Sequence, residues 1–196
     1  MCVTGTQPSR PDWNLLYATA ACQEGLFTTQ QAAEAGCSPQ LLVHHLRGGR
    51  IVRFRRGIYR LVNFPAGEHE ELVAAWLWSQ RAAVVSHQTA LSLHGLSDVL
   101  PAHAHLTLPS AWRHRRFRAP PGVVLHHADV PPEERSWFGA VPMTSARRTL
   151  NDCARAGLSP ELLRQGARQA LRRGLATKDE LAEVDAALAP YGGIAP

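Results

Sequence analysis

The sequence predicts an α+β protein built in two parts. Three short segments with helical spacing of apolar residues come first, and a tight glycine-containing turn separates the second from the third. A short hairpin rich in arginine follows directly, and after residues 65–67 helical and strand-like segments are mixed as far as the C-terminus. Three short helices followed by a hairpin are typical of a winged helix-turn-helix, which we place at residues 1–64. Residues 65–196 are expected to form a mixed α/β domain with a small sheet packed by helices.

The first two helices are predicted from their capping residues. Asp12 can cap a helix that runs to about residue 24, where Gly25 ends it. Thr28 and Gln31 have the spacing of a capping box, in which the threonine hydroxyl and the glutamine side chain each satisfy a backbone N–H. The second helix is therefore expected to begin at Thr28 and to end at Gly36.

The third helix and the hairpin follow with little chain between them. Ser38 is expected to cap the helix and Gly48 to end it. Segments 51–55 and 58–61 read as two short strands joined around Gly57. The apolar face of the helix is expected to contain Leu42, Val43 and Leu46.

The remaining elements are predicted from spacing and from glycine and proline punctuation. Their helices are expected at 70–78, 86–93, 145–156, 159–173 and 177–188, with strands at 103–108 and 123–126 and a short strand or turn near 141. We interpret Ser86 as the N-cap of its helix and not as a nucleophile, because no strand–turn–helix elbow motif surrounds it.

Basic charge is concentrated near the N-terminus. The formal net charge is +5, and 20 of the 21 basic residues are arginine. Residues 1–65 contain seven arginines and three acidic residues, whereas residues 66–143 contain six arginines and seven acidic residues. This distribution predicts a polyanionic partner for the first part.

The outer face of the third helix and the hairpin have the residue types that duplex DNA requires. Glutamine can bind adenine edges and arginine can bind guanine edges, while hairpin arginines can hold phosphates. If four to six arginines bind phosphates, log K should fall with log salt at a slope of roughly −4 to −5. The predicted DNA-binding residues are Thr28, Ser38, Gln40, His44, Arg47, Arg50, Arg53, Arg55 and Arg56.

Motifs along most of residues 25–155 resemble the AbiEi antitoxins of type IV toxin–antitoxin systems, which act in phage defence. The motifs lie at 25–36, 46–50, 56–59, 85–96, 105–109, 141–144 and 147–152. The resemblance implies a repressor of its own operon that binds inverted repeats in operator DNA and whose C-terminal domain counteracts a nucleotidyltransferase-like toxin, with or without direct contact. Two alternatives stay open, namely a protein-interaction module that neutralises a partner by binding it and a DNA-binding regulator of an unrelated operon.

Two further basic patches are candidates for a second contact with DNA or with the toxin. Three arginines spaced four residues apart share one face of a C-terminal helix, and four more lie between the strands predicted at 103–108 and 123–126. The residues are Arg113, Arg115, Arg116, Arg118, Arg164, Arg168 and Arg172.

Nothing in the sequence indicates an enzyme, a cofactor or a metal. A P-loop and a glycine-rich dinucleotide motif are both absent, and the four cysteines form no C-x-x-C pair. The histidine pairs at 103/105 and 126/127 lack cysteines or acids at ligand spacing. With no signal peptide and no apolar run of membrane-spanning length, we expect a cytoplasmic protein that does not bind membranes. It should be a monomer that pairs on DNA, since no long heptad pattern is present.

Overall fold

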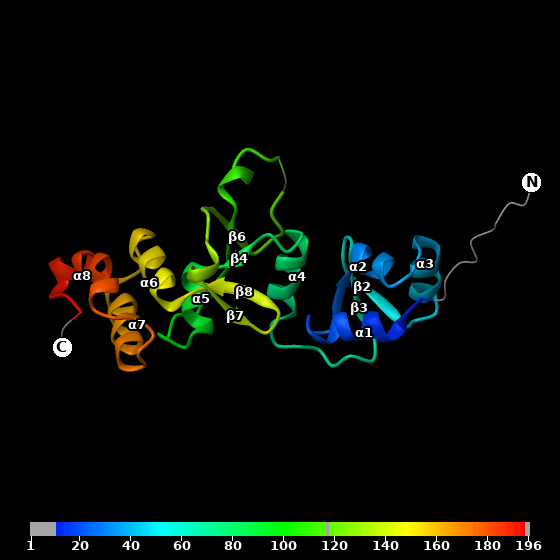
Figure 1. Ribbon diagram of the computed structural model, residues 1–196, viewed down its shortest axis with the longest axis horizontal. Coiled ribbons are helices and arrows are strands. Elements are labelled where there is room, and N and C mark those ends of the chain that lie inside the picture. Colours follow the sequence, from blue (N-terminus) through cyan, green and yellow to red (C-terminus); the bar gives the residue numbers. More distant parts are fainter. Residues whose placement is uncertain (1–10, 117, 195–196) are drawn as a thin grey trace, which may run out of the picture. The chain divides into compact units, whose positions relative to one another are not determined.

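A computed structural model describes residues 11–116 and 118–194 and divides the chain into two compact units (Figure 1). The first unit extends to Trp78 and the second begins at Ser79. We predicted the division at residue 64. It falls later because helix α4 (Glu70–Trp78) packs against strands β1 (Leu26–Thr28) and β3 (Ile58–Leu61) of the first unit. No helix among the described residues is long and apolar enough to cross a membrane.

The first unit contains three short helices and a small antiparallel sheet before α4. The helices are α1 (Trp13–Ala21), α2 (Thr29–Glu34) and α3 (Pro39–Arg47), and β2 (Ile51–Arg55) completes the sheet. The strand order is β1-β3-β2, so the predicted hairpin gains an unpredicted third strand. Strand β1 forms because Leu26 and Phe27 are fully buried and pair with β3. The mixed α/β class is confirmed.

The predicted caps of all three helices are present. Asp12 accepts a hydrogen bond from the backbone N–H of Leu15 at 3.0 Å, and Ser38 accepts one from Leu41 at 3.3 Å. Thr28 and Gln31 form the complete capping box. Each cap satisfies N–H groups that the first turn of a helix leaves without partners, which explains why the helices begin at these positions.

The core of the first unit gathers around an aromatic pair. The rings of Phe27 and Tyr59 stack with centroids 5.8 Å apart, which joins β1 to β3 through their side chains as well as their backbones. Residues from all three short helices and all three strands pack around this pair. They include Leu16, Ala20, Ala32, Ala35, Leu42, Ile51 and Leu61.

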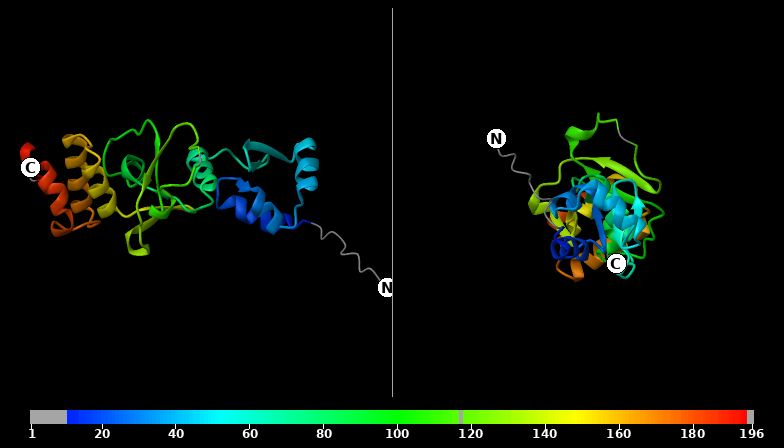
Figure 2. Two further views of the ribbon diagram at one scale, coloured as in Figure 1. Left: turned by 90° about the horizontal axis from the view of Figure 1, so that it is seen from above. Right: turned by 90° about the vertical axis from the view of Figure 1, so that its right-hand side faces the viewer.

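The second unit combines a five-stranded mixed sheet with a helical group. The helices of this group that are coloured yellow to red lie together in Figure 2. The strand order is β6-β5-β4-β8-β7, with parallel pairs β5/β6 and β4/β8 and antiparallel pairs β4/β5 and β7/β8. Strands β4 and β7 were not predicted. The strands are β4 (Val84–Val85), β5 (Ala104–Leu108), β6 (Val123–His127), β7 (Arg135–Phe138) and β8 (Val141–Thr144).

Four helices of the second unit share one hydrophobic core. They are α5 (His87–Leu93), α6 (Ala146–Arg155), α7 (Pro160–Arg172) and α8 (Ala182–Leu188). Leu91, Leu150 and Leu163 are among the core residues that join them. Gly166 lies where α7 approaches α6, since a Cβ there would come within 2.9 Å of Leu150. The predicted closing pair of helices is therefore present, although α8 begins later than expected, after a short 3-10 turn.

Candidate nucleic-acid interface

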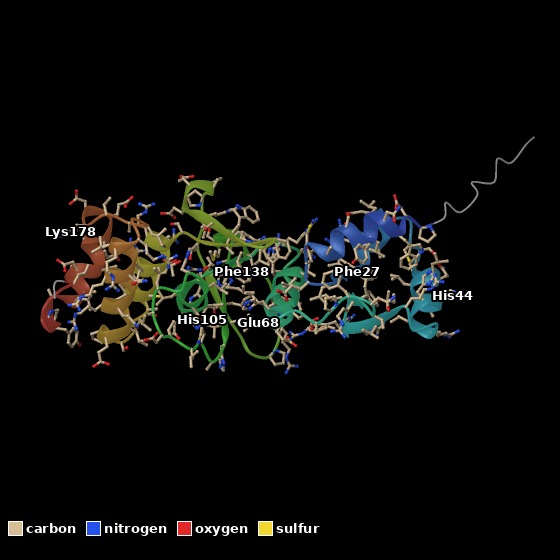
Figure 3. All side chains as sticks on the ribbon, turned by 90° about the horizontal axis from the view of Figure 1, so that it is seen from below. Phe27, His44, Glu68, His105, Phe138 and Lys178 are labelled. Carbon is tan, nitrogen blue, oxygen red and sulfur yellow. The ribbon has the colours of Figure 1, made fainter. Side chains whose placement is uncertain are left out.

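Helix α3 presents a four-residue outer face. Gln40, His44 and Arg47 are exposed, as predicted, and His44 is labelled in Figure 3. Val43 was expected to face the core, but 46% of its surface is exposed. It therefore joins the outer face, because residues spaced three, four and seven positions apart lie on one side of a helix.

His45 takes the core position that Val43 was expected to fill. It is buried, and its ring meets the Trp13 ring of α1 edge-on, with centroids 4.6 Å apart. Burial lowers the pKa of His45, and the neighbouring charges of His44 and Arg50 lower it further. A neutral histidine can pack against an indole. With His45 in the core, Val43 faces outward.

The six arginines between residues 47 and 60 divide into two groups. Arg55 and Arg60 form ion pairs with α4, Arg55 with Glu71 and Arg60 with Glu70, the latter at 3.0 Å. The predicted role of Arg55 as a phosphate contact therefore competes with an ion pair inside the unit. The acidic partners lie in α4, after the hairpin. The hairpin itself contains no acidic residue, so its sequence did not indicate these ion pairs. The other four, Arg47, Arg50, Arg53 and Arg56, are exposed and form no ion pair among the described residues.

One exposed arginine of the hairpin lies over an aromatic ring. Arg53 lies 6.0 Å from the centroid of the Tyr59 ring, which belongs to the paired strand β3. Tyr59 in turn stacks on Phe27 in the core. A guanidinium over an aromatic face gains a modest electrostatic attraction and keeps its N–H groups available.

The two hydroxyl residues of the predicted interface lie at helix N-termini. Ser38 is exposed and Thr28 is half-buried, and each hydroxyl oxygen already accepts a backbone N–H. Each still has its own O–H to donate. Donation to a phosphate oxygen at a helix N-terminus is compatible with capping, because both involve the positive end of the helix.

Residues 14–62 match the profile of a family described as "Transcriptional regulator, AbiEi antitoxin". The AbiEi match begins in α1 and ends just after β3, so it includes α3 and the whole hairpin. The resemblance inferred from the sequence is confirmed for this segment.

One solved structure is similar to the chain over nearly its whole length. The crystal structure of the RV2827C protein from Mycobacterium tuberculosis aligns with 97% of this chain and 80% of its own, at 17% identity and a TM-score of 0.44. No curated protein matches the chain significantly.

Outside the AbiEi segment, the arginines of α7 do not form the open basic face that was predicted. Arg164 donates to the carbonyl of Gly193 at 2.9 Å and to that of Tyr191, and Arg168 donates to the carbonyl of Ile194 at 2.8 Å. Arg172 is exposed and contacts Gln169 of its own helix. Arg164 and Arg168 thus hold the C-terminal segment against α7, which spacing along one helix could not reveal.

The arginines of the β5–β6 connection are exposed, as predicted. Arg115 lies over the Trp112 ring, 4.0 Å from its centroid, and Arg113 makes a long contact of 3.5 Å with the carbonyl of His127. Arg116 and Arg118 are exposed. This connection therefore remains the open basic patch of the second unit.

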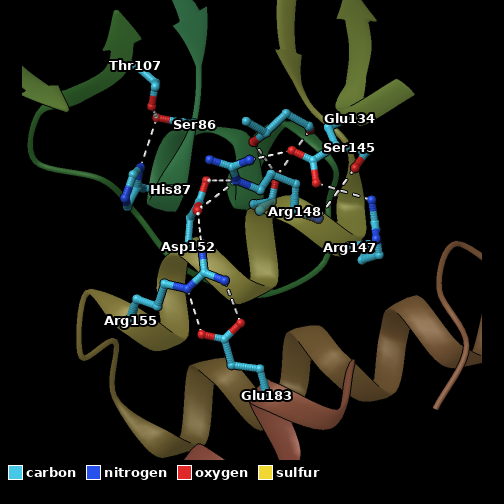
Figure 4. A network of polar contacts seen from close by, with 12 residues as sticks. Ser86, His87, Thr107, Glu134, Ser145, Arg147, Arg148, Asp152, Arg155 and Glu183 are labelled. Atoms are coloured by element: carbon cyan, nitrogen blue, oxygen red, sulfur yellow. Dashed lines mark hydrogen bonds and ion pairs between the residues drawn. The ribbon is translucent and has the colours of Figure 1, made fainter. Parts of the chain in front are cut away.

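A partly buried ion network explains the charged residues of the motif at 147–152. Arg148 donates to Asp152 at 2.9 and 3.0 Å and also to Glu134, while Arg155 binds Glu183 of α8 (Figure 4). Burial raises the pKa of Asp152, and the charge of Arg148 opposes that shift. The network joins α6 to the turn before β7 and to α8, so these charged residues have a structural role.

Proposed function

We propose that the first unit is a winged helix-turn-helix that binds duplex operator DNA, and that the chain is an antitoxin and autorepressor. The AbiEi match over residues 14–62 supports the regulator class. The observation that carries the proposal is the outer face of α3, which combines an amide, a methyl-bearing side chain and a guanidinium beside an exposed arginine hairpin.

The backbone around α3 supports this assignment. Helices α2 and α3 are separated by a turn of four residues in which Gly36 has a φ of 76°, a conformation that glycine adopts without strain. A second glycine-dependent turn at Gly49, with a φ of 69°, leads directly into β2. The short turns fix the helix relative to the hairpin, as a helix that enters the major groove with a wing beside it requires.

The side chains of the α3 face divide naturally into base contacts and phosphate contacts. Gln40 can form a paired hydrogen bond with adenine, Arg47 can do so with guanine, and Val43 can contact a thymine methyl. His44 can contact a base or a phosphate. This face therefore has the chemistry to distinguish base pairs.

The exposed arginines would hold the backbone of the duplex. Four of them, and not six, are without an ion pair among the residues described, so the expected slope of log K against log salt is about −3 to −4. The second unit would counteract a nucleotidyltransferase-like toxin. The Arg113–Arg118 connection is its remaining candidate for a second contact with DNA or toxin.

Substitution of Arg47 tests the proposed recognition face. Arg47→Ala is expected to relax preference at one base pair and to weaken operator binding by roughly 1–3 kcal/mol, because a paired contact to guanine is lost. Arg53→Ala is the matched control, since it should weaken all duplexes about equally. The measurement is fluorescence anisotropy with duplexes from the upstream region and with single-base variants. Unchanged base preference in Arg47→Ala would show that another face reads the DNA, and an absence of salt-dependent binding would favour the protein-interaction module.

A further inference from the structure

Three histidines from separate elements of the second unit meet beside the Ser86 hydroxyl. His87 begins α5, His105 lies on β5 and His126 on β6. One ring nitrogen from each lies within 4.8 Å of the others, and all three side chains are half-buried. Figure 3 labels His105, and Figure 4 shows His87 in its chain of contacts with Ser86 and Thr107.

The distances between these nitrogens suit a shared ion. His105 Nδ1 and His126 Nε2 are 3.0 Å apart. Two imidazole nitrogens bound to one tetrahedral zinc ion at 2.0–2.1 Å would lie about 3.3 Å apart. The spacing of these two nitrogens is therefore close to that of two ligands of one ion.

The three imidazoles are held in the neutral form that metal coordination requires. Burial, with smaller contributions from the nearby His126, His105 and Arg148, lowers the pKa of His87 to about 3. Burial also lowers the pKa of His105 and His126. The charge of Arg148 is balanced by Glu134 and Asp152, so it does not leave the site with an uncompensated positive neighbour.

Ser86 supplies the kind of support that metal-bound histidines usually have. Its hydroxyl is fully buried, accepts from Thr107 Oγ1 at 2.7 Å and lies 2.9 Å from His87 Nδ1. We predicted that Ser86 would cap α5, but its side chain makes no capping bond. Metal binding through Nε2 of His87 requires the tautomer in which Nδ1–H donates to the Ser86 hydroxyl oxygen.

The backbone of His87 is also unusual. Its φ is 52°, in the left-handed region that non-glycine residues rarely adopt. Such a conformation costs free energy and tends to persist where the surroundings require a particular side-chain direction. Here it occurs at the first residue of α5, whose imidazole stacks with those of His105 and His126.

We propose that His87, His105 and His126 form a binding site for one divalent transition-metal ion, with Zn²⁺ as the preferred ion and a fourth position open to water or a partner's side chain. Three neutral imidazoles suit zinc, cobalt, nickel and copper and do not suit magnesium or calcium. From the sequence we predicted no metal site, because we considered only the histidine pairs within each predicted strand, at 103/105 and 126/127. That prediction missed His87.

Metal binding requires the rings to turn. His87 and His126 are stacked at 3.5 Å with their planes 13° apart, whereas coordination needs lone pairs in the ring planes to converge. Rotation about the last side-chain torsion is the accessible motion, because that torsion is broad in histidine. In the metal-free pair, one of the two facing nitrogens of His105 and His126 carries the proton. On binding, that proton moves to the other nitrogen of its own ring.

The test is a titration of the chelator-treated full chain with Zn²⁺ by calorimetry and with Co²⁺ by visible absorption. We expect one ion per chain and the intense absorption of a tetrahedral cobalt site with three nitrogen ligands. His105→Asn should weaken binding at least tenfold, and Ser86→Ala, which keeps all three ligands, should weaken it roughly 10- to 100-fold. His103→Asn removes the exposed histidine two residues away, just before β5, and should change affinity less than twofold.

Circular dichroism of each variant shows whether it has folded. The cobalt spectrum of the unaltered protein tests the site without any substitution. The proposal is overturned if that protein takes up no stoichiometric ion, if its cobalt spectrum is octahedral, or if His103→Asn weakens binding as much as His105→Asn.

Discussion

Replacing Arg50, Arg53 and Arg56 together by alanine is expected to lower the affinity for duplex DNA on the order of 100-fold at about 150 mM salt. Each arginine that neutralises a phosphate releases condensed counterions, so the loss of three contacts should also flatten the slope of log K against log salt by about 2.7. Anisotropy titrations at several salt concentrations measure both quantities.

The matched control removes the same charge from the second unit. Arg81, Arg172 and Lys178 are exposed and lie outside the β5–β6 connection, and their joint replacement by alanine should reduce affinity less than tenfold. Equal losses in the two triple variants would mean that the protein binds DNA through its overall charge and not through the hairpin.

Arg148→Met is expected to destabilise the second unit by about 3–5 kcal/mol, because it leaves the buried Asp152 carboxylate with only a longer ion pair to Arg155, at 3.6 Å. The Asp152 side chain is only 8% exposed and that of Arg148 only 14%. Methionine has a similar length but cannot donate hydrogen bonds to Asp152 or Glu134. Urea unfolding followed by circular dichroism gives the change in the free energy of unfolding.

Arg155→Met provides the comparison for an ion pair near the surface. The Arg155 side chain is 57% exposed and binds Glu183 at 2.6 Å, so its loss should cost less than about 1 kcal/mol. If Arg148→Met proves no more damaging than Arg155→Met, the network around Arg148 does not hold the second unit together.

Local signals in the sequence were sufficient for the helices of the first unit. Asp12, Thr28 and Ser38 cap the helices they were predicted to cap, because capping depends on residues only a few positions away. Strand β1 was missed because its two buried residues give no period, and its partner strand lies about thirty residues later.

The recognition face was predicted in part. From apolar character alone, we predicted that Val43 would be buried and made no prediction for His45. Burial on a short helix also depends on the side chains that the neighbouring helix presents. The Trp13 ring offers an edge-on contact that an imidazole can fill. The consequence is functional as well as structural, because it adds a thymine-methyl contact to the proposed interface.

The pairing of charges depends on tertiary structure that the sequence does not reveal. Arg55 lies sixteen residues from Glu71, and Arg164 lies almost thirty residues from the carbonyls it binds. In the same way, His87, His105 and His126 are brought together only by the β5–β6 pairing and the start of α5. Residues of the same type therefore divide into two groups, those with partners inside the protein and those that are exposed.

Site-specific photocross-linking tests the central claim most directly. A benzoylphenylalanine placed at His44, on the exposed face of α3, should cross-link to a duplex from the upstream region. The same group at Trp137, which is 64% exposed on β7, should give little or no product. Cross-linking at position 137 with none at position 44 would contradict the assignment of the α3 face as the DNA-binding surface.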